Sequence, residues 1–242
     1  MSSTSEHLSG THWGKEKNAL DQLGYTAPLP LSEPERVAAV LAENADRASY
    51  TRNPHSSSAT VRHMLSDPGL VKYVTALCGP NLRLWRSAFF SKSEGSGEIG
   101  WHHDKHFFSN EAEDIRLDEI GSHYSVLFGL TQIDQTTGML EVLTATHQPM
   151  DGLERDSRPY HKRPANEHIL TDLPDTVLSN RRPIPIPANS FLIFHSALLH
   201  HSLPHNGGGD RLGLAIRLVA PDLVVPAELA DAKDVMSFPP AP

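Results

Sequence analysis

The hydrophobic periodicity of the chain changes near residue 81, and this change constrains the fold more than any other feature. Before it, Ser32 with Glu35 forms a capping box ahead of an apolar run, which predicts a helix. Asp67, followed by a proline, predicts the start of a second helix. After it, residues 81–92 alternate apolar and polar side chains, which is typical of a half-buried strand.

Helices followed by a series of short strands predict a mainly β fold with flanking helices. We expect a double-stranded β-helix, the cupin-like jelly roll, with N-terminal helices. The chain of 242 residues fits one such domain. Residues 1–80 would form a mostly helical buttress, residues 81–220 the jelly-roll core and residues 221–242 a tail, whose proline-rich end at residues 237–242 we expect to be loose. The further strand candidates, separated by turn signals, are residues 124–133, 139–143, 184–187, 191–199 and 212–219.

The charge balance and the cysteine content limit the partners. The formal net charge is -8, so the phosphate backbone of a nucleic acid would be repelled. No run approaches the roughly 18 apolar residues of a spanning helix, and the first residues lack an apolar signal segment. A single cysteine, Cys78, which we expect to be buried, fits a reducing compartment. We therefore expect a cytoplasmic protein with a small-molecule substrate, no nucleic acid and no membrane; its oligomeric state stays open.

The segment GWHHDKHFF, residues 100–108, concentrates side chains that can bind a metal. In an extended segment alternate side chains share a face, so His102 and Asp104 point the same way and His103 points away from them. A His-x-Asp pair with a distant histidine is the ligand set of non-haem iron(II) oxygenases, which leaves positions open for substrate and dioxygen. A hydrogen-bonded His–Asp contact at a strand end is the alternative, because the chain contains 15 histidines.

A second block, residues 191–218, supplies the distant histidine. An apolar strand leads to His200, whose neighbour Ser202 lies on the same face; His201 is the rival ligand. After a glycine turn, Arg211 begins another apolar strand, and its planar guanidinium suits the distal carboxylate of 2-oxoglutarate. The alternative is that this arginine starts a surface strand and pairs with the aspartate before it.

In this combination the sequence resembles the phytanoyl-CoA dioxygenase-like family of Fe(II)- and 2-oxoglutarate-dependent oxygenases. The resemblance spans residues 67–220 in separate blocks. Within the block GMLEVLTATH, residues 144–146 replace the Pro-Gly-Ser that the family usually has. This change affects the local turn but no ligand. The matching blocks are the helix-then-strand lead-in at 67–92, WHHD at 101–104, GMLEVLTATH at 138–147, and FHSALLHHS followed by PHN and an arginine.

The resemblance implies the roles of particular residues. The Fe(II) ligands would be His102, Asp104 and His200, and 2-oxoglutarate would be held by Arg211 with Ser202. The other candidates are positioned close to these residues in the sequence. They are Arg86 for a further contact to the co-substrate, and Trp101, His103, His106 and Phe107 for the substrate pocket.

The implied activity is hydroxylation of an unactivated C–H bond of a small polar metabolite, with O2 consumed and 2-oxoglutarate converted to succinate and CO2. Asp104 fills the position that a small residue takes in halogenating relatives, which favours hydroxylation. Acidic residues 109–122 and basic residues within 155–163 suggest a free amino acid or a derivative. The alternatives are desaturation or cyclisation on the same platform, a zinc hydrolase with the same ligands, and a non-catalytic jelly-roll binding protein.

Overall fold

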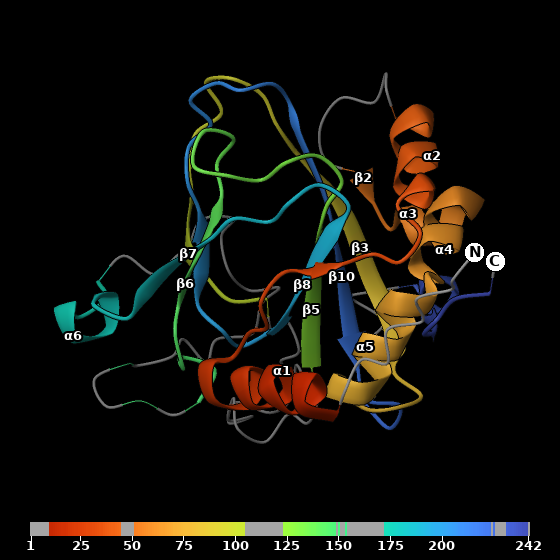
Figure 1. Ribbon diagram of the computed structural model, residues 1–242, viewed down its shortest axis with the longest axis horizontal. Helices are drawn as coiled ribbons and strands as arrows, with labels where there is room; N and C mark the ends of the chain where they lie inside the picture. The colour runs from red at the N-terminus through yellow and green to blue at the C-terminus, as the bar shows by residue number, and fades with distance from the viewer. Residues whose placement is uncertain are drawn as a thin grey trace, which may run out of the picture.

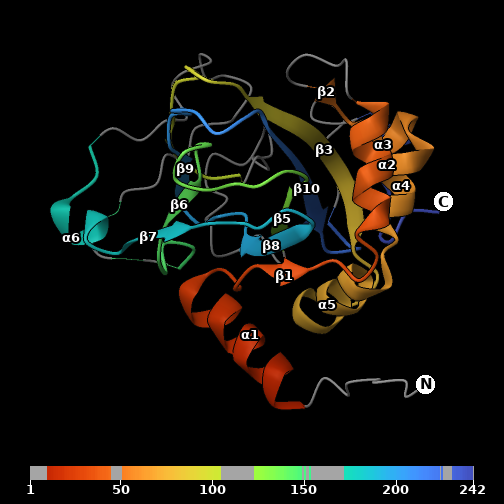
Figure 2. The same ribbon diagram turned by 45° about the horizontal axis from the view of Figure 1, so that its top comes forward.

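The computed structural model describes residues 10–44, 51–104, 123–148, 150, 153, 172–223, 225 and 231–241. Two antiparallel sheets face each other, which confirms the predicted jelly roll (Figures 1 and 2). The strands are β1 (Leu29–Pro30), β2 (Thr51–Arg52), β3 (Arg83–Lys92), β4 (Ile99–His102), β5 (His123–Gly129), β6 (Leu140–Leu143), β7 (Arg181–Ile184), β8 (Ser190–His195), β9 (His200–Ser202), β10 (Arg211–Val219) and β11 (Met236–Ser237). The larger sheet has the order β1-β8-β5-β10-β3-β11, with β2 paired to β3, and the smaller sheet has the order β4-β9-β6-β7.

Most of the helices lie on the larger sheet (Figure 2). None of the described helices is long and apolar enough to cross a bilayer. The buried apolar cluster of this face contains residues of α2, α4 and α5 together with alternate residues of the central strands. Cys78 is buried, as predicted. The helices are α1 (Gly10–Leu23), α2 (Glu35–Glu43), α3 (Pro54–Ser57), α4 (Ala59–Leu65), α5 (Pro68–Cys78) and α6 (Asp175–Leu178), with the 3-10 turn η2 (Ala232–Asp234).

Asp67 caps α5, and its carboxylate also joins α2 to α5. Its Oδ1 accepts a hydrogen bond from the N–H of Leu70 at 2.9 Å, which confirms the predicted cap. The predicted capping box of α2 is wrong, because Pro34 is the N-cap residue and makes no side-chain cap bond. The Ser32 hydroxyl instead donates to Asp67 Oδ2 at 2.9 Å, and the Glu33 N–H donates to the same oxygen at 2.8 Å. A buried carboxylate is a stronger acceptor than the serine hydroxyl is, so it attracts the donors of this turn.

The long strands agree with the predicted periodicity, and the shorter ones differ in their bounds. The alternating segment 81–92 and the apolar segment 212–219 become β3 and β10. The predicted strand over 191–199 is wrong beyond β8, because the chain turns after His195 and enters β9 of the other sheet. Residues on both sides of this turn are buried, so the sequence is apolar throughout and gives no sign that the chain crosses from one sheet to the other.

The C-terminal segment is not a loose tail in its described part, so that expectation is wrong. Strand β11 pairs with β3, with Met236 opposite Leu84. The N–H of Phe238 donates to the Leu82 carbonyl at 2.8 Å, and its ring is buried in the main core. The apolar area of this ring outweighs the local preference of a proline-rich segment for an open conformation.

Candidate active site

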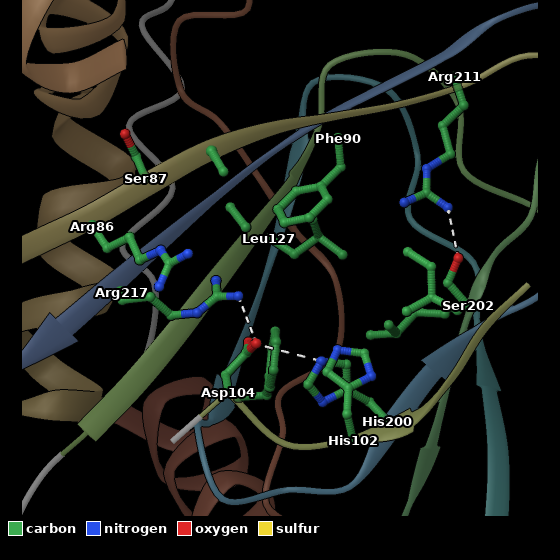
Figure 3. Close-up of a pocket in the computed structure, with 15 residues that line it drawn as sticks. Arg86, Ser87, Phe90, His102, Asp104, Leu127, His200, Ser202, Arg211 and Arg217 are labelled. Atoms are coloured by element: carbon green, nitrogen blue, oxygen red, sulfur yellow. Dashed lines mark hydrogen bonds and ion pairs between the residues drawn. The ribbon is translucent and has the colours of Figure 1, made fainter. Parts of the chain in front are cut away.

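The inner faces of the two sheets enclose a cavity of about 290 Å³, close to the lower end of the size range of ligand pockets (Figure 3). Alternate residues of β10 face this cavity, whereas Leu214, Ile216 and Leu218 between them belong to the core under the helices. The cavity therefore lies between the sheets and is continuous with the hydrophobic interior. Its lining residues are Arg86, Ser87, Ala88, Phe90, Ile99, His102, Asp104, Leu127, Leu140, Phe194, His200, Ser202, Arg211, Ala215 and Arg217.

Two imidazoles and one carboxylate converge in this cavity. The pairing of β4 with β9 places His102 directly opposite His200. Asp104 follows β4, and its Oδ2 lies 3.8 Å from Nε2 of His200. One potential ligand atom from each of the three residues lies within 4.8 Å of the other two. In the described part of the chain, this is the group of histidine, cysteine and acidic side chains with the geometry to hold a metal ion.

Both imidazoles are oriented by backbone carbonyls. Nδ1 of His102 lies 2.7 Å from the Gly100 carbonyl, and Nδ1 of His200 lies 2.9 Å from the Leu198 carbonyl. A carbonyl only accepts, so each Nδ1 carries the proton and each Nε2 keeps its lone pair for a metal. Burial lowers the pKa of His200 below its ordinary value, although the nearby carboxylate opposes this effect. The neutral imidazole is the form that binds metals.

Asp104 is held from three sides and is only 3 % exposed. Arg217 on β10 donates to its Oδ1 at 2.6 Å, and the Ser125 hydroxyl on β5 donates to its Oδ2 at 2.9 Å. Its backbone N–H donates to the Ser196 carbonyl at 2.8 Å. These contacts fix the orientation of the carboxylate. The sequence analysis missed Arg217 and Ser125, although the period of β10 puts position 217 on the same face as Arg211.

The structure separates His201 from the metal-binding group. Its Nε2 lies 2.6 Å from Oε2 of Glu141 on the adjacent strand β6. Its ring stacks on Trp101 with centroids 4.0 Å apart. Trp101 packs against a small apolar cluster that includes Leu143 and Leu199, and it is not one of the residues that line the cavity. His200 is thus the histidine of this pair that faces His102.

Arg211 and Ser202 lie together at the other end of the cavity from Asp104 (Figure 3). Arg211 Nη1 donates to the Gly138 carbonyl and lies 3.4 Å from the Ser202 hydroxyl. No carboxylate of the described residues forms an ion pair with this arginine, and Asp210 is exposed. Burial lowers the pKa of Arg211 to about 10. Lys92 lies opposite Arg211 on β3, so two cations occupy this end.

Of the remaining predicted residues, one lines the cavity, one is described but lies outside the lining, and two fall outside the described part of the chain. Arg86 lines the cavity at the Asp104 end, beside Arg217 (Figure 3). His103 is not one of the lining residues. His106 and Phe107 lie outside the described residues, as do the acidic segment 109–122 and the basic residues within 155–163 from which an amino-acid substrate was predicted.

The donor set fits a divalent metal with open coordination positions. Two neutral imidazoles with available Nε2 atoms and one oriented carboxylate occupy one side of a common point, as in the sites of non-haem iron(II) oxygenases. The cationic end with Arg211 suits an anion bound in the same cavity. The cavity therefore brings together a group of residues that could hold a metal ion and a cationic end that could hold an anion.

Comparisons with known proteins agree with this architecture. The sequence profile described as phytanoyl-CoA dioxygenase (PhyH) matches residues 21–213. A search of curated protein sequences found no match to the chain. Two similar solved structures come from nogalamycin biosynthesis. SnoK, a non-heme alpha ketoglutarate dependent carbocyclase, has a TM-score of 0.68 at 15% identity, with 98% of this chain and 99% of that chain covered.

SnoN, a non-heme alpha ketoglutarate dependent epimerase, has a TM-score of 0.65 at 17% identity, with 87% of this chain and 83% of that chain covered. ThoJ, a non-heme monooxygenase, has a TM-score of 0.62 at 17% identity, with 85% of this chain and 77% of that chain covered. At these identities the likeness concerns the fold. The same fold thus carries epimerisation, carbocycle formation and oxygenation in these three proteins.

The orientation of the two adjacent histidines predicts opposite effects of one substitution. His200→Gln removes an imidazole that faces His102, so we expect Mn(II) affinity to fall by about a hundredfold or more. His201→Gln keeps a donor toward Glu141 and should change this affinity by less than about tenfold. Isothermal titration calorimetry with Mn(II) compares the two variants. A larger loss in His201→Gln than in His200→Gln would contradict the assignment.

Proposed function

The chain belongs to the phytanoyl-CoA dioxygenase family of Fe(II)- and 2-oxoglutarate-dependent enzymes, and we propose that it hydroxylates an unactivated C–H bond of a small polar metabolite. The reaction would consume O2 and 2-oxoglutarate and release succinate and CO2. A free amino acid or a derivative is the proposed type of substrate. His102, Asp104 and His200 are the proposed iron ligands.

One observation supports this proposal most strongly. The three potential metal ligands and the pair Arg211–Ser202 line the same cavity, although they come from separate strands. A zinc hydrolase needs the metal ligands but has no use for a buried cation beside them. A non-catalytic jelly roll needs neither group. Binding of 2-oxoglutarate to an iron ion requires both groups: ligands for the iron, and a cation for the distal carboxylate.

The residues of the chain have distinct roles in this proposal. Iron(II) bound at the three ligands supplies the activation of O2, which is coupled to oxidative decarboxylation of 2-oxoglutarate. Arg211 and Ser202 hold the distal carboxylate and so orient the co-substrate. The apolar side chains of Phe90, Leu127 and Phe194 exclude water from the space beside the ligands.

Asp104 supports hydroxylation over halogenation. A carboxylate at this position occupies a coordination site that a halide would otherwise need. Arg217 and Ser125 keep this carboxylate turned toward His200. Desaturation and cyclisation begin from the same ligand set, so they are distinguished by the mass of the product and not by the site.

We expect the protein to convert 2-oxoglutarate to succinate even when its own substrate is absent. Protein supplied with Fe(II), 2-oxoglutarate and O2 should form succinate and consume oxygen, and a metabolite panel read by mass spectrometry should identify a product heavier by one oxygen atom. Asp104→Ala should lose at least about a hundredfold of succinate formation. Asp222→Ala, at an exposed loop position, is the matched control. Absence of succinate, or undiminished succinate from Asp104→Ala, would contradict the proposed function.

A pH dependence follows from Lys92. Burial first, and then the charge of Arg211, lowers the pKa of Lys92 to about 8, while Glu98 opposes the shift. As the pH rises through this value the lysine loses its charge, so the attraction for a carboxylate at Arg211 weakens. The carboxyl groups of 2-oxoglutarate stay ionised throughout this range, because ordinary carboxyl groups titrate near pH 4.

We therefore expect the Kd for 2-oxoglutarate, measured by calorimetry on the Mn(II)-loaded protein, to increase severalfold between about pH 7 and about pH 9. Lys92→Met should bind more weakly at the lower pH and show a flat profile. Lys233→Met removes an exposed lysine and should retain the wild-type profile. A flat wild-type profile, or an unchanged slope in Lys92→Met, would refute the role of Lys92.

A further inference from the structure

A row of four side chains crosses the face of the smaller sheet that points away from the cavity. Each strand of this sheet contributes one member, in the order of the strands β4, β9, β6 and β7. The Trp101 ring stacks on the His201 ring, and Nε2 of His201 lies 2.6 Å from Oε2 of Glu141. Nε of Arg181 lies 3.8 Å from the same carboxylate oxygen. The row therefore lies behind two of the potential metal ligands, on the same strands.

The central pair of this row is buried. Glu141 is 9 % exposed and His201 is 6 % exposed. Arg181 has 58 % of its side chain exposed, so its long contact with the carboxylate contributes little. An apolar cluster that includes Leu143 and Leu199 lies on the same face and limits the access of water to the pair. A buried carboxylate without a donor is costly, so the contact with Glu141 holds His201 on this face.

Strand β9 needs such a contact, because its backbone pairing is short and its sequence is ambiguous. It spans His200–Ser202 and pairs with β6 over these three residues. Its first two residues are both histidines, so either could present an imidazole to the cavity. Backbone hydrogen bonds do not depend on the side chains, so a shift of the pairing by one residue would turn His201 inward and His200 outward. Side-chain contacts therefore have to determine which histidine faces His102.

We propose that Glu141 is a positioning residue that sets the register of β9 and thereby selects His200 as the metal-binding histidine. This inference rests on the metal site of the proposed function. In the observed register Glu141 lies directly opposite His201 and accepts its Nε2–H. In the shifted register the buried carboxylate would lose this donor, and the imidazole would lose its stacking on Trp101. Glu141 thus acts on the metal site through the histidine that does not bind the metal.

Metal affinities of double variants test the register. Mn(II) is titrated by calorimetry into Glu141→Leu, with and without His200→Gln or His201→Gln. Without the acceptor at position 141, His201 can turn inward and replace His200 as a ligand. The loss of affinity caused by His200→Gln should therefore be at least about tenfold smaller in the Glu141→Leu background than in the wild-type background. The loss caused by His201→Gln should be at least about tenfold larger there, whereas a substitution that only lowers stability would change neither loss.

A conservative variant and a control assign the effect to the acceptor. Glu141→Gln keeps an oxygen that can accept from Nε2–H and should retain the wild-type preference for His200. Asp222→Leu removes an exposed carboxylate and should also retain it. If the two losses stay the same in the Glu141→Leu background, the inference is overturned. An equal change in the Glu141→Gln or the Asp222→Leu background would overturn it as well.

The same titrations separate this inference from the proposed function. If Mn(II) binds the wild-type protein through His200, but Glu141→Leu leaves the preference for this histidine unchanged, only the role of Glu141 fails. If Mn(II) does not bind, or if His200→Gln has no effect in the wild-type background, the proposed function itself fails. Should Glu141→Leu not fold, Glu141→Thr, whose hydroxyl ends short of His201, replaces it in the same comparison.

Discussion

The site depends on the short antiparallel pairing between β4 and β9. This pairing places His102 opposite His200 and orders the backbone from which Asp104 emerges. Backbone carbonyls fix both imidazoles, and Arg217 and Ser125 fix the carboxylate. A change of one residue in the register would bring His201 to the inner face, because side chains alternate along a strand.

Strand β10 links the stability of the fold to the chemistry of the site. Its outward residues bury apolar surface under the helices, and its inward residues include Arg211 and Arg217. The buried guanidiniums are costly unless anions or dipoles compensate them. The packing of the other face supplies the rigidity with which the strand holds these charges in place. The same strand therefore contributes to core packing, lines the cavity with Arg211 and orients the Asp104 carboxylate, which are the roles that the proposed function requires of it.

Local periodicity made the metal-binding group predictable, because His102 and Asp104 belong to one extended segment and the distant block has the same period. Arg217 and Ser125 were missed because their role depends on how strands far apart in sequence align. The choice between His200 and His201 likewise needed the partner of the second histidine, Glu141. The crossing from β8 to β9 and the packing of Phe238 in the core leave no periodic pattern in the sequence. Both depend on tertiary packing between distant segments.

The most direct test of the account is anomalous diffraction at the iron absorption edge, from crystals loaded with Fe(II) and 2-oxoglutarate without oxygen. We expect one iron peak within coordination distance of Nε2 of His102, Nε2 of His200 and a carboxylate oxygen of Asp104. A peak at another group, such as His201 with Glu141, or no peak between the sheets, would contradict it.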